Sequence, residues 1–299
     1  MKVLLRSKTG IAIATAMILF MSLVFVAEAL SDRPLNLVAP GETRIGSPFL
    51  VYVSAPKIIE DLIITWEGAT VSPEVEILAG GCEAMVLVGT DVGSSKPGPG
   101  VLEVSSVIEG ESFSITRHID VIHREFPVQR LSLPAGMVTP PEGVLERIKI
   151  EREESLKALE TMTSARKWTI PFTRPVPGVI TSPYGFRRIL NGQPRAPHRG
   201  VDYRAREGDP ILAAADGTVV LSADHYYAGE CLYVDHGNGV VTVYMHLSRR
   251  LAEEGDLVSA GDVIALAGRT GRVTGPHLHF GLSLQGKMVD PEPLLEKSK

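Results

Sequence analysis

The segment Gly275-Pro276-His277-Leu278-His279-Phe280 decides how the last third of this 299-residue chain is interpreted. Residues two apart on a β-strand project from the same face, so an extended backbone places the side chains of His277 and His279 next to each other. A helix would separate them, and the proline with its preceding glycine disfavours a helix here. The segment therefore predicts a strand that carries two imidazoles on one face.

Two further segments have a similar spacing. His198 and Asp202 are four residues apart, and Tyr244 and His246 are two apart, so each pair shares a face if its stretch is extended. Three such strands side by side would assemble a metal pocket, because two imidazoles and one carboxylate can bind zinc and leave its fourth position to water. The remaining histidines would be available for proton transfer. The sequence therefore predicts a site for metal-assisted hydrolysis.

The other four histidines of the chain have no such neighbours. We expect surface or strand-packing roles for His118 and His123. His225 and His236 lack partners in the sequence, and the second lies in an apparent turn, where a solvated or turn-stabilising role is expected. Tyr244 either supports a developing oxyanion or is an ordinary strand aromatic.

Two parts of the chain have the pattern of β-strands. Residues 168–299 contain short apolar or β-branched runs separated by turns rich in Gly, Asp and Asn, which predicts a β domain. Residues 30–125 predict an antiparallel, immunoglobulin-like β-sandwich, because short strand-like runs alternate there with Gly-, Pro- and Ser-rich breaks. The clearest of these runs lie at residues 49–53, 62–66, 84–88 and 112–115.

A linker over residues 126–167 connects the two and contains a predicted helix at about 140–165. Thr139 supplies an N-cap hydroxyl and Glu142 completes a capping box. An interrupted apolar stripe follows, formed by Leu145, Ile148, Leu156, Leu159 and Met162. Such a helix is either a lid or partner helix, or a spacer that packs on one domain; we favour the spacer, because such stripes usually bury against their own protein.

Residues 1–29 have the pattern of a secretory signal peptide. A positive start precedes an uncharged apolar run over residues 10–26 and a small-residue cleavage site at Ala27-Glu28-Ala29. The run is long for a cleaved signal, so an uncleaved membrane anchor is the alternative. Both interpretations predict export. With no sorting signal or wall-binding module in the sequence, we expect the periplasm, with inner-membrane anchoring or secretion as alternatives.

Charge and cysteine content narrow the possible partners. Without residues 1–29, Lys+Arg falls from 30 to 27 and Asp+Glu from 35 to 34, so the formal net charge changes from −5 to −7. This acidic balance argues against a nucleic-acid partner, which needs a concentrated basic surface. The two cysteines, Cys82 and Cys231, either form an interdomain disulfide or are small buried residues, and neither has the spacing of a zinc site.

The ordered segments resemble the lysostaphin/LytM family of zinc metallopeptidases, which cut peptide cross-links in bacterial peptidoglycan. The resemblance covers about residues 170–295. It is carried by the histidine segments together with Ser182-Pro183-Tyr184-Gly185-Phe186-Arg187 and the glycine-bracketed turn at residues 255–262. It implies a mostly β peptidase domain of the duplicated-hybrid-motif type. The chain departs from the family pattern at Met245, Cys231 and Gly281, none of which is an expected metal ligand.

The resemblance also implies a role for each site residue. Carried over by position, His198, Asp202 and His279 are the zinc ligands, and His246 and His277 form the catalytic pair. A metal-bound water would attack the peptide carbonyl while the two imidazoles handle the proton and the oxyanion. The sequence does not assign these two tasks between the histidines.

The resemblance implies an exported zinc metalloendopeptidase acting on peptidoglycan peptide stems. A non-catalytic relative that regulates another cell-wall hydrolase is the first alternative, although all five family positions are filled. A carrier domain is the second alternative, and it is disfavoured by the export signal and by the His198–Asp202 pair. Residues 30–125 have no recognisable chemistry; we expect them to position the peptidase near its substrate or a protein partner, or to shield the metal cleft.

Overall fold

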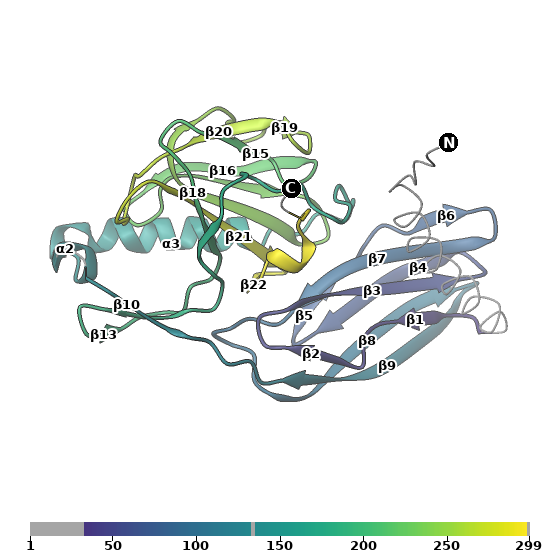
Figure 1. Ribbon diagram of the computed structural model, residues 1–299. Helices are drawn as coiled ribbons and strands as arrows, with labels where there is room; N and C mark the ends of the chain where they lie inside the picture. Colours follow the sequence, from purple (N-terminus) through teal and green to yellow (C-terminus); the bar gives the residue numbers. More distant parts are fainter. Residues whose placement is uncertain (1–32, 133–134, 298–299) are drawn as a thin grey trace, which may run out of the picture.

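The computed structural model describes residues 33–132 and 135–297 and contains two β regions joined by a short helical segment (Figure 1). A sandwich formed by the N-terminal region lies at the lower right of Figure 1, and the C-terminal strands, with helix α3 beside them, lie at the upper left. The predicted mostly β fold is confirmed. The predicted leader lies outside the described residues, and no helix among the described residues is long and apolar enough to span a membrane.

The N-terminal region is a sandwich of two sheets, as the sequence predicts. One sheet contains, in spatial order, β1 (Asn36–Val38), β3 (Pro48–Ala55), β7 (Gly81–Gly89) and β6 (Glu76–Leu78). The other contains, in spatial order, β2 (Glu42–Arg44), β9 (Glu111–Ile122), β8 (Gly98–Ile108), β4 (Ile59–Trp66) and β5 (Ala69–Val71). All pairs within the two sheets are antiparallel except β2 with β9.

The sandwich core follows the alternation of its strands. Every second residue of β3 is buried, so one face of this strand points into the core and the other does not. Trp66 is the largest core side chain; its ring meets Phe49 edge-on at 5.2 Å, and its indole N–H donates to the Gly89 carbonyl. Only glycine fits at position 100, because a Cβ there would run into the Trp66 ring. The contacts of Trp66 with Phe49 and Gly89 join the two sheets, because these two residues lie on β3 and β7.

The connecting segment contains β10 (Val128–Leu131), α2 (Ala135–Val138), a 3-10 turn (Glu142–Val144) and α3 (Leu145–Leu159). Helix α3 is shorter than expected, and the predicted capping box is wrong. Glu142 belongs to the 3-10 turn and not to α3. The residue before α3 is Val144, whose side chain makes no capping hydrogen bond. The predicted apolar stripe is largely exposed at Leu145 and Leu156, whereas Ala158 is buried.

The C-terminal region is built on a ten-stranded sheet. Seven of its strands form one continuous row in which neighbours are hydrogen-bonded. In spatial order they are β11 (Ile180–Ser182), β14 (Val201–Arg204), β21 (His277–Leu284), β18 (Val240–Arg250), β17 (Gly229–Asp235), β16 (Gly217–His225) and β19 (Leu257–Val258). The other three strands are β15 (Pro210–Leu212), β20 (Val263–Ala267) and β22 (Lys287–Val289). Strand β20 pairs with β15 and with the end of β18, and β22 pairs antiparallel with β21. A short sheet of β10, β12 (Arg187–Leu190) and β13 (Gln193–Pro194) stands beside it, and a 3-10 turn (Glu292–Leu294) follows β22.

The central strands are buried on both faces. On β17, Leu232 and Val234 belong to the main core, whereas Cys231 and Tyr233 point to the opposite face. Helix α3 covers that opposite face through Ala158, and the Tyr233 hydroxyl donates to Ser155 at 3.2 Å. The helix therefore packs on the C-terminal region, as a spacer would, although largely without its predicted apolar stripe.

The two β regions pack against each other through Tyr184, from the motif at residues 182–187. Its hydroxyl donates to the Met288 carbonyl at 2.6 Å and accepts the Val92 N–H at 3.1 Å, which links the C-terminal sheet to the sandwich. Gln285 adds a hydrogen bond to the Leu87 carbonyl at 2.9 Å. The motif thus also has a structural role between the regions.

The cysteines form no disulfide. Cys82 is buried in the sandwich core and Cys231 in the layer under α3. Burial raises the pKa of the Cys231 thiol to about 12. Of the two alternatives that the sequence leaves open, the structure therefore supports two separate buried thiols.

Candidate metal centre

Strands β14, β21 and β18 lie side by side, as the spacing of the histidine segments predicts. Asp202 on β14 is directly opposite His279 on β21, and His279 is directly opposite Met245 on β18. Val201 and Leu278, which directly precede Asp202 and His279, point into the main hydrophobic core of the C-terminal region. Strand alternation therefore places Asp202 and His279 on the other face, the one that α3 partly covers.

His198 reaches the same place by a different route. The sequence suggests that it shares an extended strand with Asp202, but β14 begins only at Val201, so this expectation is wrong. The backbone of His198 is held against the 182–187 motif, because its carbonyl accepts the Gly185 N–H at 2.7 Å and its N–H donates to the Phe186 carbonyl at 2.9 Å. A loop anchored at both backbone groups thus aims the imidazole at Asp202.

Three potential ligand atoms converge at this point. His198 Nε2 lies 2.9 Å from Asp202 Oδ1 and 3.0 Å from His279 Nδ1, and Asp202 Oδ1 lies 2.8 Å from His279 Nδ1. These residues form a group that could hold a metal ion, and it is the only such group of His, Cys, Asp and Glu found within residues 33–132 and 135–297. Two imidazole nitrogens and one carboxylate oxygen fit a catalytic zinc site with an open position.

The electrostatics of the group favour the ligand forms of Asp202 and His279. Burial would raise the pKa of the Asp202 carboxyl, but hydrogen bonds from His198 and His279 outweigh it and hold this pKa well below its usual range. Burial lowers the pKa of His279 to about 4. His198 Nδ1 lies 2.9 Å from the Pro183 carbonyl, which can accept an Nδ1–H; with a metal bound, that tautomer would make Nε2 the ligand atom. An ionised carboxylate and neutral imidazoles are the states that a divalent metal binds.

Gly200 allows the ligands to approach one another. A Cβ at this position would lie 2.6 Å from His279 Cε1 and 2.6 Å from the Phe280 carbonyl oxygen. Any side chain would displace the ring or the strand. The glycine of the His198-x-Gly200-x-Asp202 segment is therefore explained by close packing.

His246 and His277 stand together beside this group. Their ring centroids are 4.8 Å apart, and His277 Nε2 lies 3.9 Å from Asp202 Oδ1. His246 Nδ1 is 3.0 Å from the Thr270 carbonyl, and His277 Nδ1 is 2.9 Å from the Gly275 carbonyl. Each carbonyl can accept an Nδ1–H, and in that neutral tautomer Nε2 is the atom that carries the lone pair. Burial, together with the positive charges of the neighbouring imidazoles, lowers the pKa of His246 to about 3.

Tyr244 does not face the site. Its side chain is fully buried in the main core, where its ring packs on Phe280 and its hydroxyl accepts the Ala214 N–H at 2.9 Å. Strict alternation would put His246 on the same face, but His246 has a left-handed backbone with φ of 63°. This local break turns the imidazole to the opposite face. The strand-aromatic alternative for Tyr244 is therefore the one observed.

A cavity of about 410 Å³ opens onto the site. Its lining includes His198, His246 and His279 from the C-terminal region and Ile148 and Ser155 from α3. The helix thus forms one wall of the site, in addition to its packing role. No described residue before position 148 lines this cavity.

Sequence reasoning missed the environment of His225. This side chain is buried, lines the same cavity and has two partners on α3, with Nε2 3.1 Å from Glu154 and Nδ1 3.4 Å from Ser155. The partners lie about 70 positions away, so no local pattern signals them. His236 is also fully buried, between the Asp216 carbonyl and the Thr242 hydroxyl, and so stabilises its turn from inside.

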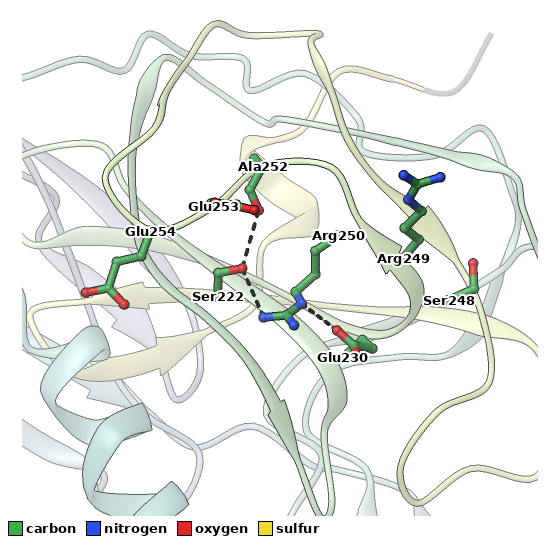
Figure 2. A pocket seen from close by; sticks show the side chains of 8 residues that line it. All are labelled: Ser222, Glu230, Ser248, Arg249, Arg250, Ala252, Glu253 and Glu254. Atoms are coloured by element: carbon green, nitrogen blue, oxygen red, sulfur yellow. Dashed lines mark hydrogen bonds and ion pairs between the residues drawn. The ribbon is translucent and has the colours of Figure 1, made fainter.

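The larger cavity in Figure 2, about 530 Å³, is a separate feature of the same sheet. Part of its polar lining is paired internally: the Arg250 guanidinium points at Glu230 and at the Ser222 hydroxyl, whereas Arg249 points away. None of the histidines or Asp202 lines it. Volume alone therefore does not identify the functional site.

Comparison with known proteins finds matches over the part of the chain that carries these residues. Residues 196–291 match the model of peptidase family M23. Over 112 residues the chain is 46% identical to the peptidoglycan DD-endopeptidase ShyA of Vibrio cholerae, covering 37% of this chain and 26% of that protein. It is 40% identical over 112 residues to the DD-carboxypeptidase/endopeptidase Mpg of Neisseria meningitidis, covering 38% and 26%. The matches thus span about a quarter of the length of these relatives.

The likeness to a solved structure extends over both β regions. A crystal structure of a putative peptidase M23 from Pseudomonas aeruginosa has a TM-score of 0.63 and 27% identity, and it covers 89% of this chain and 97% of that chain. The sandwich, the connecting helix and the C-terminal sheet therefore occur together in another protein. The C-terminal region of this chain is a domain of peptidase family M23, the lysostaphin/LytM family that its sequence motifs resemble.

Proposed function

We propose that this protein is an exported zinc metalloendopeptidase that hydrolyses peptide cross-links of bacterial peptidoglycan, at an amide between two D-configured centres as in the DD-endopeptidase relatives. The observation that carries the proposal is the convergence of His198 Nε2, Asp202 Oδ1 and His279 Nδ1, with two further imidazoles beside them. A purely structural site would need a fourth protein ligand, whereas three ligands leave a position for water.

When bound, zinc would acidify a water molecule and polarise the scissile carbonyl. His198, Asp202 and His279 would hold it, and Arg188 would keep Asp202 in place by donating to its Oδ2 at 3.2 Å. His246, buried and neutral with a free Nε2, would accept the proton of the attacking water. The side chain of His277 is more exposed than that of His279, and its Nε2 lies 3.9 Å from Asp202 Oδ1, next to the proposed ligands. It would stabilise the developing oxyanion and protonate the leaving amine.

The alternative of a non-catalytic regulator finds less support. Loss of function in such a relative would be expected to remove a ligand or a catalytic histidine, yet all five expected side chains are present and adjacent. Export and a periplasmic location remain proposals; they are supported by the pattern of residues 1–29 and by the extracytoplasmic position of peptidoglycan.

For the sandwich we propose a positioning role. No described residue of the sandwich lines the cavity, whereas α3 does, so shielding of the cleft by the sandwich has little support. Disrupting the sandwich core by Trp66→Ala should reduce co-sedimentation with purified sacculi while hydrolysis of a small cross-linked peptide continues. Unchanged co-sedimentation of a variant with an unfolded sandwich would contradict this role.

The main test is digestion of purified sacculi by the mature protein, with and without a chelator, followed by mass analysis of the fragments. We expect chelator-sensitive release of peptide stems. His279→Ala should lose both zinc and activity, whereas His246→Ala should lose activity and keep zinc. His118→Ala, an exposed histidine of the sandwich, is the matched control and should change neither. Absence of any chelator-sensitive cleavage would overturn the enzymatic proposal.

A further inference from the structure

The backbone of β18 is irregular at His246. Between the pairs Tyr244–Leu232 and Leu247–Glu230, β18 contains two residues and β17 only one, which is the pattern of a β-bulge. The bulge coincides with the left-handed φ of 63° at His246. This conformation is uncommon for a residue other than glycine, and it persists only where the surrounding structure holds it. The direction of the His246 imidazole therefore depends on contacts from outside its own strand.

Several contacts beside this bulge meet at Thr270, in the loop between β20 and β21. Its hydroxyl accepts the Glu230 N–H at 2.9 Å and donates to the Leu247 carbonyl at 2.7 Å. Glu230 and Leu247 are directly opposite each other on β17 and β18, so the hydroxyl bridges the two strands immediately after the bulge. The backbone carbonyl of Thr270 lies 3.0 Å from His246 Nδ1. One residue thus contacts both the backbone next to His246 and its ring.

The start of β17 packs closely against this loop. Gly229 has a φ of 62°, and a Cβ there would run into the hydroxyl and the carbonyl carbon of Thr270. The preceding residue, Ala228, accepts the His246 N–H at 2.9 Å through its carbonyl. Two neighbouring residues therefore hold the loop and the bulge against each other, and glycine is required at one of them because the approach is so close.

The contact between the Thr270 carbonyl and the His246 ring has a chemical consequence. When Nδ1 donates to this carbonyl, the neutral ring carries its lone pair on Nε2, because the partner of one ring nitrogen decides the role of the other. The ring centroid of His246 lies 6.1 Å from that of the proposed ligand His279. A general base there needs a lone pair on the nitrogen that faces the attacking water.

We propose that Thr270 is a positioning residue, whose hydroxyl fixes the bulge and whose carbonyl fixes the orientation and tautomer of His246. The catalytic consequence rests on the proposed function, in which His246 accepts a proton, whereas the contacts themselves do not. Without the hydroxyl, the Glu230 N–H and the Leu247 carbonyl lose this partner, and the loop is no longer tied to the bulge. A displacement of about 1 Å is enough to lower a catalytic rate strongly.

The test compares Thr270→Val, which removes the hydroxyl at nearly constant volume, with Thr270→Ser, which keeps it. With the zinc-loaded full-length protein and a cross-linked peptide, Thr270→Val should lower kcat about 10–100-fold, while KM and zinc content change by less than about two-fold. Thr270→Ser should keep kcat within about three-fold of the unaltered protein, since its hydroxyl can make both hydrogen bonds. Thr116→Val, the same change at an exposed threonine of the sandwich, is the matched control and should keep full activity.

A second readout does not depend on catalysis. Nitrogen-15 NMR of the histidine rings reports which ring nitrogen carries the proton, and the His246 signals are assigned by their absence in His246→Ala. We expect the Nδ1–H tautomer in the unaltered protein and in Thr270→Ser, and a shift toward the Nε2–H tautomer in Thr270→Val.

The outcomes separate the two proposals. If the unaltered protein does not cleave the peptide, the peptidase function is wrong, and the NMR spectra alone then decide the positioning role. An Nε2–H tautomer in the unaltered protein, or His246 signals that stay unchanged in Thr270→Val, would overturn that role. A loss of kcat in Thr270→Ser as large as in Thr270→Val would overturn it as well.

Discussion

Side chains alternate between two faces along the strands of both β regions, but the two regions differ in whether the second face of the sheet is covered. In the sandwich, β3 alternates between buried and partly exposed residues, so each sheet has one apolar face and one outer face. In the C-terminal sheet, β17, β18 and β21 are buried along nearly their whole length, because α3 covers the second face. That second face carries the proposed ligands. Where a sheet has two covered faces, one can hold a core and the other a protected polar site.

The buried polar side chains mark this difference. The sandwich buries Thr43, Thr90, Asp91 and Ser106, none of which is a histidine. The C-terminal region buries several ionisable groups, which are costly to bury unless they are bonded to one another or to a ligand; they include His198, Asp202, His225, Asp235, His236, His246, His279 and Asp290. The comparison predicts that damage to the sandwich affects stability, whereas damage to the covered polar face affects metal binding.

The largest expected effect is on the sandwich core. Trp66→Ala should lower the free energy of unfolding by about 3–5 kcal/mol, the cost of removing a large buried aromatic. Trp168, the second tryptophan of the chain, is buried in the C-terminal core and reports on that region by fluorescence. Chemical denaturation with this probe should show the C-terminal region still folded and zinc still bound. If zinc were released at the same denaturant concentration at which the sandwich unfolds, the two regions would unfold as one unit.

Acid should destabilise the protein through His236. Burial lowers the pKa of this imidazole from 6.5 to about 4. Between these values the unfolded chain binds a proton that the folded protein excludes. The contribution of His236 to the free energy of unfolding is therefore fully present above pH 6.5 and is lost as the pH falls toward 4. The total loss should be roughly 3 kcal/mol. In urea denaturation of the zinc-loaded protein, His236→Gln should have a shallower pH dependence over this window, and an identical slope would contradict the assignment.

A smaller effect is expected from Gly200→Ala. The added Cβ would press on the ring of His279, so zinc affinity should fall by about 10–100-fold, comparable to the loss of an outer-sphere partner. Competition with a chromogenic chelator measures this affinity. Gly41→Ala in the sandwich is the control, since a Cβ there meets nothing within 4 Å. Unchanged affinity in Gly200→Ala would show that the ring can shift without cost.

The smallest effect is expected from reducing agents. A disulfide would contribute about 2–4 kcal/mol, so its absence predicts no measurable change in unfolding free energy on adding a reductant. A thiol reagent should label neither Cys82 nor Cys231 in the folded protein and both after denaturation. Rapid labelling of one thiol under native conditions would indicate that its region opens locally.

The spacing rule for strands predicted the direction of some candidate side chains and failed for others. His277 and His279 could be assigned to one face because both lie on a single strand, where side-chain direction depends only on residue spacing. The same rule failed between Tyr244 and His246, because a left-handed residue interrupts the alternation of β18. It failed for His198 as well, since a loop and not a strand carries that side chain. Periodicity is reliable only while the backbone stays regular.

By itself, the sequence determined the two β regions, the connecting helix and the inventory of five polar side chains for a metal site. These depend on local spacing, apolar patterning and turn residues, all of which act over a few positions. Only the tertiary structure decided that α3 walls the cavity, that His225 is bonded to this helix, that Arg188 reaches Asp202 and that both cysteines stay unpaired. Most of these contacts join residues far apart in the chain, and even the closer Arg188–Asp202 pair depends on a loop. They arise when covered sheet faces and anchored loops bring such residues together, which no local pattern encodes.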